Sequence, residues 1–127
     1  LHRWALYDRE ELPRWSDGRV VLLGDACHPM LPFLAQGAVM AIEDAFVLAR
    51  EVTKASDIES GLKNYEIHRK PRCSRVQEGA RANAKLFHKG NPATQISTYG
   101  PMWVAGRFMQ SFVHSRNDWL YGHDVTA

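Results

Sequence analysis

The chain has 127 residues, the length of one domain, and a globular composition with 45% hydrophobic and 24% charged residues. Sixteen Lys and Arg against fourteen Asp and Glu give a formal net charge of +2, which is too balanced for nucleic acid or an anionic membrane to be a partner held by bulk charge. The apolar runs of four or five residues also fall far short of the ~20 that span a membrane.

The first predicted elements are strands. Residues 1–12 hold Trp4, Leu6 and Tyr7 and predict a short edge strand, followed by a turn at 13–18, where Pro and Asp-Gly favour turn geometry. Residues 20–23 are apolar throughout, which is typical of a buried central strand. This strand ends at Gly24 and Asp25, so it delivers a carboxylate to the edge of a sheet.

Helices are predicted for most of the remaining chain. After a loop with two prolines, apolar residues recur at helical spacing over 37–53 and predict a mostly buried helix, with the charged residues Glu43 and Asp44 elsewhere on it. The apolar residues of this stripe are Val39, Ile42, Ala45, Phe46, Ala49 and Val52.

Two further helices are predicted. The sequence Ser56 to Glu59 matches the S-x-x-E capping box and predicts the start of a second helix, which Pro71 should kink or interrupt. Good helix formers continue over 72–88 until Gly90-Asn91-Pro92, and a last helix is predicted over 101–116.

This content, one or two strands and three or four helices, leaves a buried strand without enough sheet neighbours. Unpaired backbone groups are costly when buried, so the missing strands should come from sequence outside this chain or from another chain. The chain opens Leu-His-Arg-Trp, without an initiator Met, which also suggests a piece of a longer protein. We expect no secretory signal before the domain in this sequence. We therefore expect the chain alone to self-associate or to form a domain-exchanged oligomer.

The segment from Arg19 to Ala45, RVVLLGDACHPMLPFLAQGAVMAIEDA, carries the chemistry. It places Asp25 where α/β folds bind ligands, and it begins a helix at Gln36-Gly37-Ala38 whose free amides can face an anion. A carboxylate for ligand hydroxyls beside such a helix terminus would suit a flavin with its ribityl chain. The spacing alone allows other ligands.

This segment resembles the second flavin-binding motif of the class A FAD-dependent aromatic hydroxylases, the group that includes salicylate hydroxylase. That motif runs G-D-A-x-H-P and, after a Pro-containing loop, Q-G-x-x-x-A-x-E-D-A. The resemblance covers essentially the whole chain and is most specific over residues 15–46. The matching residues are Gly24, Asp25, Ala26, His28, Pro29, Gln36, Gly37, Ala41, Glu43, Asp44 and Ala45.

The resemblance implies an α/β FAD/NAD(P)-binding fold, of which this chain would be a mostly α-helical C-terminal part with one or two strands. Residues 1–18 would be an edge strand and turn from the side of the substrate domain. Residues 19–53 would be the last strand, loop and helix of the FAD-binding domain, and 54–127 a C-terminal helical region.

The resemblance also implies site residues and cofactors. Asp25 would bond a ribityl hydroxyl of FAD, the backbone of Gly37 and Ala38 would face the pyrimidine edge of the flavin, and Phe33 and Leu34 would line the substrate side. The implied cofactor-binding residues are Gly24, Asp25, Pro29, Gln36, Gly37 and Ala38. Enzymes of this family use NAD(P)H to reduce FAD, and molecular oxygen to hydroxylate a small aromatic substrate.

The sequence departs from the family because none of its nine glycines fits G-x-G-x-x-G, which holds the ADP half of FAD. The pyridine-nucleotide motif found mid-chain in the family and most of the substrate domain are also absent, so the chain alone should not be competent. No residue pattern indicates a catalytic nucleophile or general base with its partner. Two alternatives remain. The protein could belong to another flavin-superfamily oxidoreductase, or it could be a non-catalytic helical module that self-associates.

Several residues have simpler interpretations. His28 has no third ligand at usable spacing, so we expect no metal and a histidine that bonds loop backbone. Cys27 should be a small buried filler, and the two cysteines, far apart and in no CxxC pattern, indicate a reducing, cytoplasmic setting. Glu43 and Asp44 suit the start of a helix dipole. A basic cluster over 63–85 is typical of a solvated helix face.

Overall fold

The computed structural model of the chain describes residues 5–108 and 118–126. The chain divides into two compact units, Leu1–Ala84 and Lys85–Ala127. The elements in chain order are β1 (Ser16–Asp17), β2 (Val20–Val21), the short 3-10 helices η1 (Gly24–Ala26) and η2 (Pro32–Leu34), and the helices α1 (Gly37–Lys54), α2 (Ile58–Phe87), α3 (Pro92–Phe108) and α5 (Asp118–Tyr121).

The sheet of the described residues is one small hairpin. β1 pairs antiparallel with β2, with Ser16 opposite Val21, and Gly18 turns the chain between them with φ +55°, a conformation that glycine adopts without strain. Two predictions are wrong here. Of the strand predicted over 1–12, residues 5–12 form none, and residues 1–4 lie outside the described residues. Val20 is 67% exposed rather than buried. An apolar strand needs a neighbour on each side to be buried, and in the described residues β2 has one partner, β1.

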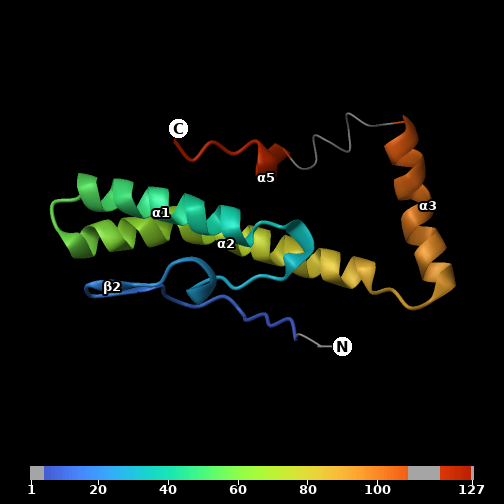
Figure 1. Ribbon diagram of the computed structural model, residues 1–127, viewed down its shortest axis with the longest axis horizontal. Helices are drawn as coiled ribbons and strands as arrows, with labels where there is room; N and C mark the ends of the chain where they lie inside the picture. Colours follow the sequence, from blue (N-terminus) through green and yellow to red (C-terminus); the bar gives the residue numbers. More distant parts are fainter. Residues whose placement is uncertain (1–4, 109–117, 127) are drawn as a thin grey trace. The chain divides into compact units, whose positions relative to one another are not determined.

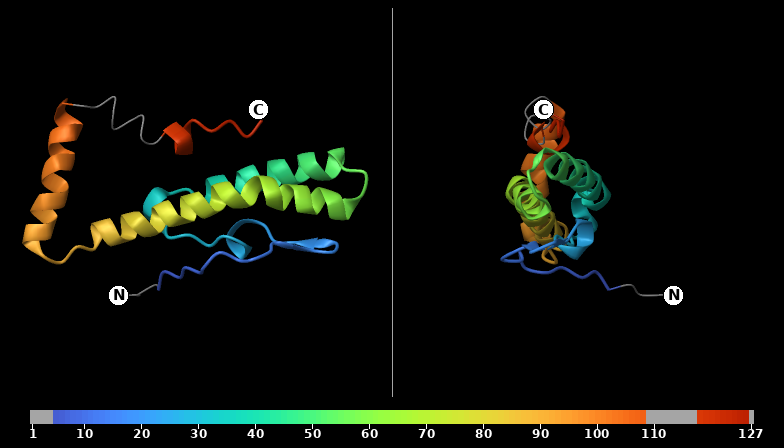
Figure 2. Two further views of the ribbon diagram at one scale, coloured as in Figure 1. Left: turned by 180° about the vertical axis from the view of Figure 1, so that it is seen from behind. Right: turned by 90° about the vertical axis from the view of Figure 1, so that its left-hand side faces the viewer.

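Helices α1 and α2 run antiparallel, side by side, in both views of the ribbon (Figures 1 and 2). The helix predicted from Gly37 is confirmed, with its end at Lys54. The start predicted for the next helix is one residue off: Asp57 caps α2, accepting the Ser60 amide at 2.9 Å. Asp57 also accepts the Ser60 hydroxyl at 2.7 Å, so the carboxylate takes the capping position that the sequence assigned to Ser56.

The buried face of α1 is not the predicted one. Ile42 is 71% and Phe46 is 43% exposed, whereas Met40, Asp44 and Val47 are buried against the rest of the first unit. Hydrogen bonds and ion pairs satisfy the charged members of the buried face, so polar side chains occupy positions that hydrophobicity alone would assign to solvent.

Helix α2 continues through Pro71 without interruption. Pro71 is exposed, which places the missing amide hydrogen bond on the solvent side of the helix. Buried residues on both sides of the proline, Arg69 and Cys73 among them, hold the two halves on the same surface. Tertiary packing therefore overrides the local preference of proline to break a helix.

The core of the first unit is aromatic and sulfur-rich at its centre. The Trp15 ring lies 5.4 Å from the His28 ring and 6.1 Å from the Tyr65 ring, measured between centroids. The Tyr65 hydroxyl donates to the Leu22 carbonyl at 3.3 Å. The buried hydrophobic residues of this unit are Trp15, Cys27, Met40, Val47, Leu62, Tyr65, Cys73, Val76 and Ala80.

The second unit begins at Lys85, near the end of α2. The break that the sequence predicts at Gly90-Asn91-Pro92 is confirmed, since α2 ends at Phe87 and α3 starts at Pro92. The expected start at 101 is wrong because Asn91 caps the helix earlier: its side chain accepts the Ala93 amide at 2.9 Å, and proline is favoured at the first helical position. The predicted part beyond 108 lies outside the described residues. None of the described helices is long and apolar enough to cross a membrane.

Candidate functional site

A pocket of about 590 Å³ lies between η1, the loop after it and the start of α1. It brings together residues that are 10 or more positions apart in the sequence, including Asp25 from η1 and Ala38 from α1. The lining residues are Leu23, Gly24, Asp25, Met30, Leu31, Pro32, Ala35, Gly37, Ala38 and Ala41. Four of the predicted cofactor-binding residues, Gly24, Asp25, Gly37 and Ala38, therefore face one hollow.

The pocket has two kinds of polar group. Asp25 is exposed and offers a carboxylate, and a Cβ added at Gly37 would lie 3.9 Å from its Oδ1. Gln36, the residue before α1, makes no side-chain cap, and its buried Oε1 has no hydrogen-bond partner among the described residues. The first amides of α1 thus carry the positive end of the helix dipole without a side-chain partner.

Such a pocket fits a ligand with hydroxyl groups beside a delocalised negative charge. The absence of a Cβ at Gly37 lets a flat group approach the backbone between Asp25 and the helix start. The donor set is therefore compatible with part of a flavin, as the sequence predicts.

The other four predicted residues do not line this pocket. The Pro29 carbonyl accepts Gln77 Nε2 at 2.7 Å, which holds the loop on α2. Phe33 lies in η2, where its carbonyl accepts Asn83 Nδ2 at 3.3 Å. Leu34 lies against α2 as well, because a Cβ at Gly79 would come within 3.1 Å of its Cδ1. Gln36 is buried directly before the helix.

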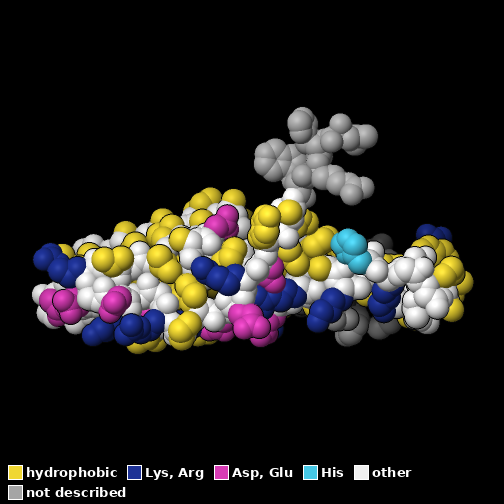
Figure 3. All heavy atoms as spheres, turned by 90° about the horizontal axis from the view of Figure 1, so that it is seen from below, with side chains coloured by type: hydrophobic (Ala, Val, Ile, Leu, Met, Phe, Trp, Pro, Cys, Tyr) yellow, Lys and Arg dark blue, Asp and Glu magenta, His cyan; other side chains and the backbone are white. Residues whose placement is uncertain are grey.

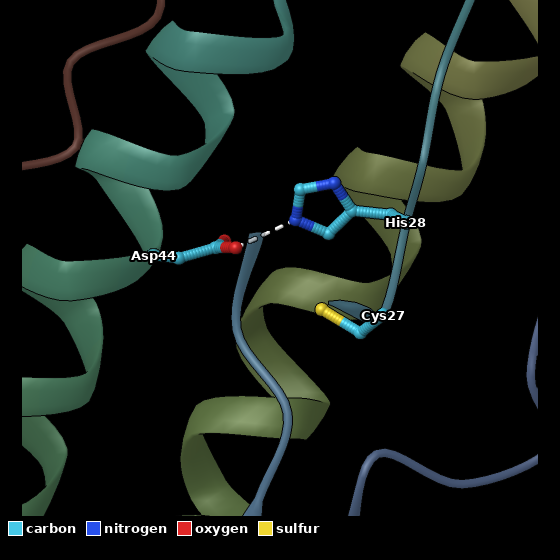
Figure 4. A group of neighbouring side chains, drawn as sticks. All are labelled: Cys27, His28 and Asp44. Atoms are coloured by element: carbon cyan, nitrogen blue, oxygen red, sulfur yellow. Dashed lines mark hydrogen bonds and ion pairs between the residues drawn. The ribbon is translucent and has the colours of Figure 1, made fainter. Parts of the chain in front are cut away.

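Behind the pocket lies a buried cluster centred on Asp44, which is fully buried. Its Oδ2 accepts the Gly24 amide at 3.1 Å and lies 2.6 Å from His28 Nε2. Its Oδ1 accepts Arg69 Nε at 2.7 Å. Figure 4 shows the His28 ring directed at the Asp44 carboxylate, with the Cys27 sulfur nearby.

Arg69 extends this cluster across the two helices. Its Nη1 donates to Glu43 Oε2 at 2.7 Å, and Arg72 donates to the same carboxylate from Nε at 2.8 Å and Nη2 at 3.0 Å. Both arginines come from α2 and both acids from α1. Two buried acids are thus matched by two arginines, which is the condition for charges to be tolerated in a protein interior.

The pKa shifts follow from this pairing. Burial alone would raise the pKa of Asp44, but the hydrogen bonds from His28 and Arg69 outweigh burial and lower the pKa below its ordinary value. The pKa of Glu43 is lowered for the same reason, with Arg72 and Arg69 outweighing burial. Asp44 is therefore a carboxylate that can only accept, so the proton between it and His28 is carried by His28 Nε2.

Cys27, His28 and Asp44 offer ligand atoms within 4.8 Å of one another. Their other bonds argue against a metal centre. Both Asp44 oxygens already accept hydrogen bonds, and burial followed by the Asp44 charge raises the pKa of the Cys27 thiol to about 12. A protonated thiol beside an occupied carboxylate makes a poor ligand set.

This cluster was not among the predicted site residues. His28 bonds a side chain rather than the predicted loop backbone, and Arg69, expected on a solvated face, is 2% exposed. The signal was present in the spacing: Met40, Asp44, Val47 and Glu51 follow one helical face, as do Tyr65, Arg69, Cys73 and Val76 on α2. The prediction that Cys27 is buried is confirmed.

Comparison with known proteins decides the family. The model of the FAD-binding domain family matches residues 3–80, more than half of the chain. The chain belongs to this family. The small hairpin and long helices described above are thus one part of an FAD-binding α/β fold, as the resemblance implied.

Relatives of this FAD-binding domain chain are similar along nearly its whole length. A 6-hydroxynicotinate 3-monooxygenase of Bordetella bronchiseptica is 42% identical over 100% of the chain. A 3-hydroxybenzoate 6-hydroxylase of Aquipseudomonas alcaligenes is 45% identical over 97% of it. The chain spans 27% and 30% of the length of these two proteins.

A solved structure agrees with this assignment. A salicylate hydroxylase in complex with its substrate matches 97% of the chain with a TM-score of 0.75 and 33% identity. The chain covers 29% of that protein. A second solved structure, HpxO of Klebsiella pneumoniae in complex with FAD, has a TM-score of 0.74 and 29% identity over 88% of the chain.

Proposed function

We propose that the chain is the C-terminal part of an FAD-dependent monooxygenase that hydroxylates a small aromatic acid of the salicylate type. The names of the relatives support the reaction class. The observation that carries the proposal is the shared pocket of Asp25, Gly37 and Ala38, since these are the residues to which the family motif assigns flavin contacts.

In this proposal Asp25 accepts a hydrogen bond from a ribityl hydroxyl. The amides at the start of α1, at Gly37 and Ala38, donate to the pyrimidine edge of the flavin and stabilise negative charge there. When bound, FAD supplies the redox and oxygen chemistry, with NAD(P)H as the reductant. The chain's own contribution is to position the ring and to set the field around it.

The proposal keeps the expected division of the chain, with residues 19–53 in the FAD-binding domain, 1–18 beside the substrate domain and 54–127 as a helical region. Gly24 then lines the flavin pocket beside Asp25. Pro29 and Gln36 support the flavin loop rather than line its pocket, since the Pro29 carbonyl is bonded to α2. Phe33 and Leu34 remain proposed for the substrate side. Two free, buried cysteines are compatible with a reducing, cytoplasmic setting.

The test uses the complete reading frame that encodes this sequence. The purified protein should carry FAD, shown by its visible absorbance. It should also consume NAD(P)H and oxygen when given salicylate or a hydroxybenzoate, with a hydroxylated product found by chromatography. A complete protein that binds no FAD would overturn the proposal. FAD-dependent turnover without a hydroxylated aromatic product would instead favour another flavin-superfamily oxidoreductase.

A further inference from the structure

We infer that Asp44 is a positioning residue for the flavin pocket: it holds both ends of the segment that carries Asp25, although it is buried and does not line the pocket. This inference rests on the proposed function, because its effect is expected on FAD. It also makes a structural claim that can be measured without FAD.

The first step is the geometry of one oxygen atom. Asp44 Oδ2 accepts the Gly24 amide at 3.1 Å, and it lies 2.6 Å from His28 Nε2, with which it shares a hydrogen bond. Residues 24 and 28 flank Asp25, so a single buried atom bonds the chain on both sides of the pocket carboxylate. The segment between them is also bonded to itself, since the amides of Cys27 and His28 donate to the Gly24 carbonyl at 3.0 Å.

The second step is that this segment needs an external restraint. Gly24 adopts φ +61°, which is open to glycine but leaves the residue with many alternative conformations. Asp25 itself is exposed. The contact that holds the turn on α1 is close, because a Cβ at Gly24 would meet the Ala41 Cβ at 3.3 Å. Asp44 lies on the same helix, one turn from Ala41, and supplies the polar part of that contact.

The third step is the anchor of Asp44. Arg69 Nε donates to Oδ1 at 2.7 Å, and Arg69 is 2% exposed. Arg69 of α2 therefore holds the Asp44 carboxylate through Oδ1, and the carboxylate holds the segment 24–28 through Oδ2. A side chain fixed in this way can hold a neighbouring group to a fraction of an ångström, which flavin and substrate alignment require.

Glu43 provides a matched control. It is the adjacent acid on α1, it is also buried, with 8% of its surface exposed against 0% for Asp44, and it bonds the same Arg69 at 2.7 Å. Among the described residues its side chain accepts hydrogen bonds from Arg69 and Arg72 of α2 and from none of residues 24–28. Glu43→Gln should therefore disturb the charge cluster without releasing the Asp25 segment.

The experiment compares Asp44→Asn and Glu43→Gln in the complete protein by hydrogen–deuterium exchange and by FAD titration, well below the unfolding midpoint of each variant. Asp44→Asn should raise amide exchange over residues 24–28 and weaken FAD binding roughly tenfold, since it weakens charge-assisted bonds to both ends of the segment. Glu43→Gln should leave both quantities at the parent value. His28→Phe removes one of the two hydrogen bonds to Asp44 Oδ2 and should raise exchange and weaken FAD binding by a smaller amount. This variant tests the inference if Asp44→Asn does not fold.

Parent-like exchange over 24–28 in Asp44→Asn, or an equal increase in Glu43→Gln, would overturn the inference. Increased exchange confined to the Asp44 variant, in a protein that binds no FAD, would overturn the proposed function and leave the structural role of Asp44 supported. Increased exchange with unchanged FAD affinity would contradict the role in positioning the flavin pocket.

Discussion

At the scale of residues, the chain buries charge where its sequence suggests an apolar interior. Asp44 and Arg69 are both almost fully buried and lie on different helices, and their bond at 2.7 Å is reinforced by Glu43. A buried pair of this kind is poor evidence of net stabilisation, but removal of one member leaves the other uncompensated. Two predictions follow from that asymmetry.

Arg69→Met should lower the free energy of unfolding by about 3–5 kcal/mol, because Asp44 and Glu43 would lose a shared buried partner. The measurement is urea unfolding of the chain at neutral pH. Lys63→Met, an exposed position on the same helix, serves as the control and should change stability by less than about 0.5 kcal/mol. Equal losses in the two variants would show that the cluster contributes nothing specific.

The pH dependence of stability should reflect the two acids. The folded chain lowers the pKa of Asp44 below 3.8 and of Glu43 below 4.5, so between the folded and unfolded pKa values the unfolded state binds more protons. The stability that these two acids contribute is fully present above the pKa values that they have in the unfolded chain. It is lost as the pH falls through the lower pKa values that they have in the folded chain. Urea unfolding should therefore give a steady free energy from about pH 7 to about pH 5 and a decline below about pH 4.5. A flat profile down to about pH 3 would contradict the assignment.

At the scale of elements, local signals predicted where helices lie but not which faces they bury. The start of α1 at Gly37 and the break before α3 follow from glycine, proline and apolar spacing. The buried side of α1 does not follow from these signals. Ile42 and Phe46 fit an apolar stripe but are exposed, whereas Asp44 is buried because it pairs with Arg69 of α2, 25 positions further along the chain. Pairing between residues far apart in the sequence determines which face of such a helix is buried, and a local sequence pattern does not contain that information. Four of the eight predicted site residues line the pocket, because one contiguous motif holds them. The other four do not line it, since their contacts with α2 and their burial depend on the fold.

The crossing of α1 and α2 depends on the absence of a side chain at Gly61. A Cβ there would lie 2.8 Å from Val52 Cα and 3.1 Å from the Glu51 carbonyl oxygen, both backbone atoms. Gly61→Ala should therefore lower the free energy of unfolding by about 1–3 kcal/mol, although alanine ordinarily favours a helix.

The control for this crossing is Gly106→Ala in α3, where a Cβ would meet nothing within 4 Å. That change should be neutral or stabilising by up to about 1 kcal/mol. Thermal unfolding of the two variants beside the parent distinguishes these effects. A Gly61 variant as stable as the parent would mean that the helices cross less closely than the structure shows.

At the scale of the whole molecule, the chain exposes apolar side chains that a complete FAD-binding fold would need to cover. Ile42 and Ile67 are 71% and 67% exposed, and Val20 is as exposed as Ile67. Figure 3 shows hydrophobic side chains among the charged ones on one face. Apolar surface of this kind promotes association. The sequence also predicts exposed apolar surface, because the apolar segment at 20–23 has too few strand neighbours.

The chain alone should therefore self-associate as its concentration rises. Multi-angle light scattering across a dilution series should give a mass above that of one chain, decreasing on dilution. Ile42→Asp, which places a charge on the exposed side of α1, should shift this equilibrium toward the monomer. A single monomeric mass at all concentrations would contradict the prediction.

The central claim is that this chain supplies a flavin contact through Asp25. The most direct test is the dissociation constant of FAD for the complete protein and for its Asp25→Ala variant. Loss of a hydrogen bond to a charged acceptor is worth ~1.5–3 kcal/mol, so the variant should bind FAD roughly ten- to a hundredfold more weakly. At saturating FAD it should also consume more NAD(P)H per molecule of product. An FAD affinity unchanged from that of the parent would contradict the claim.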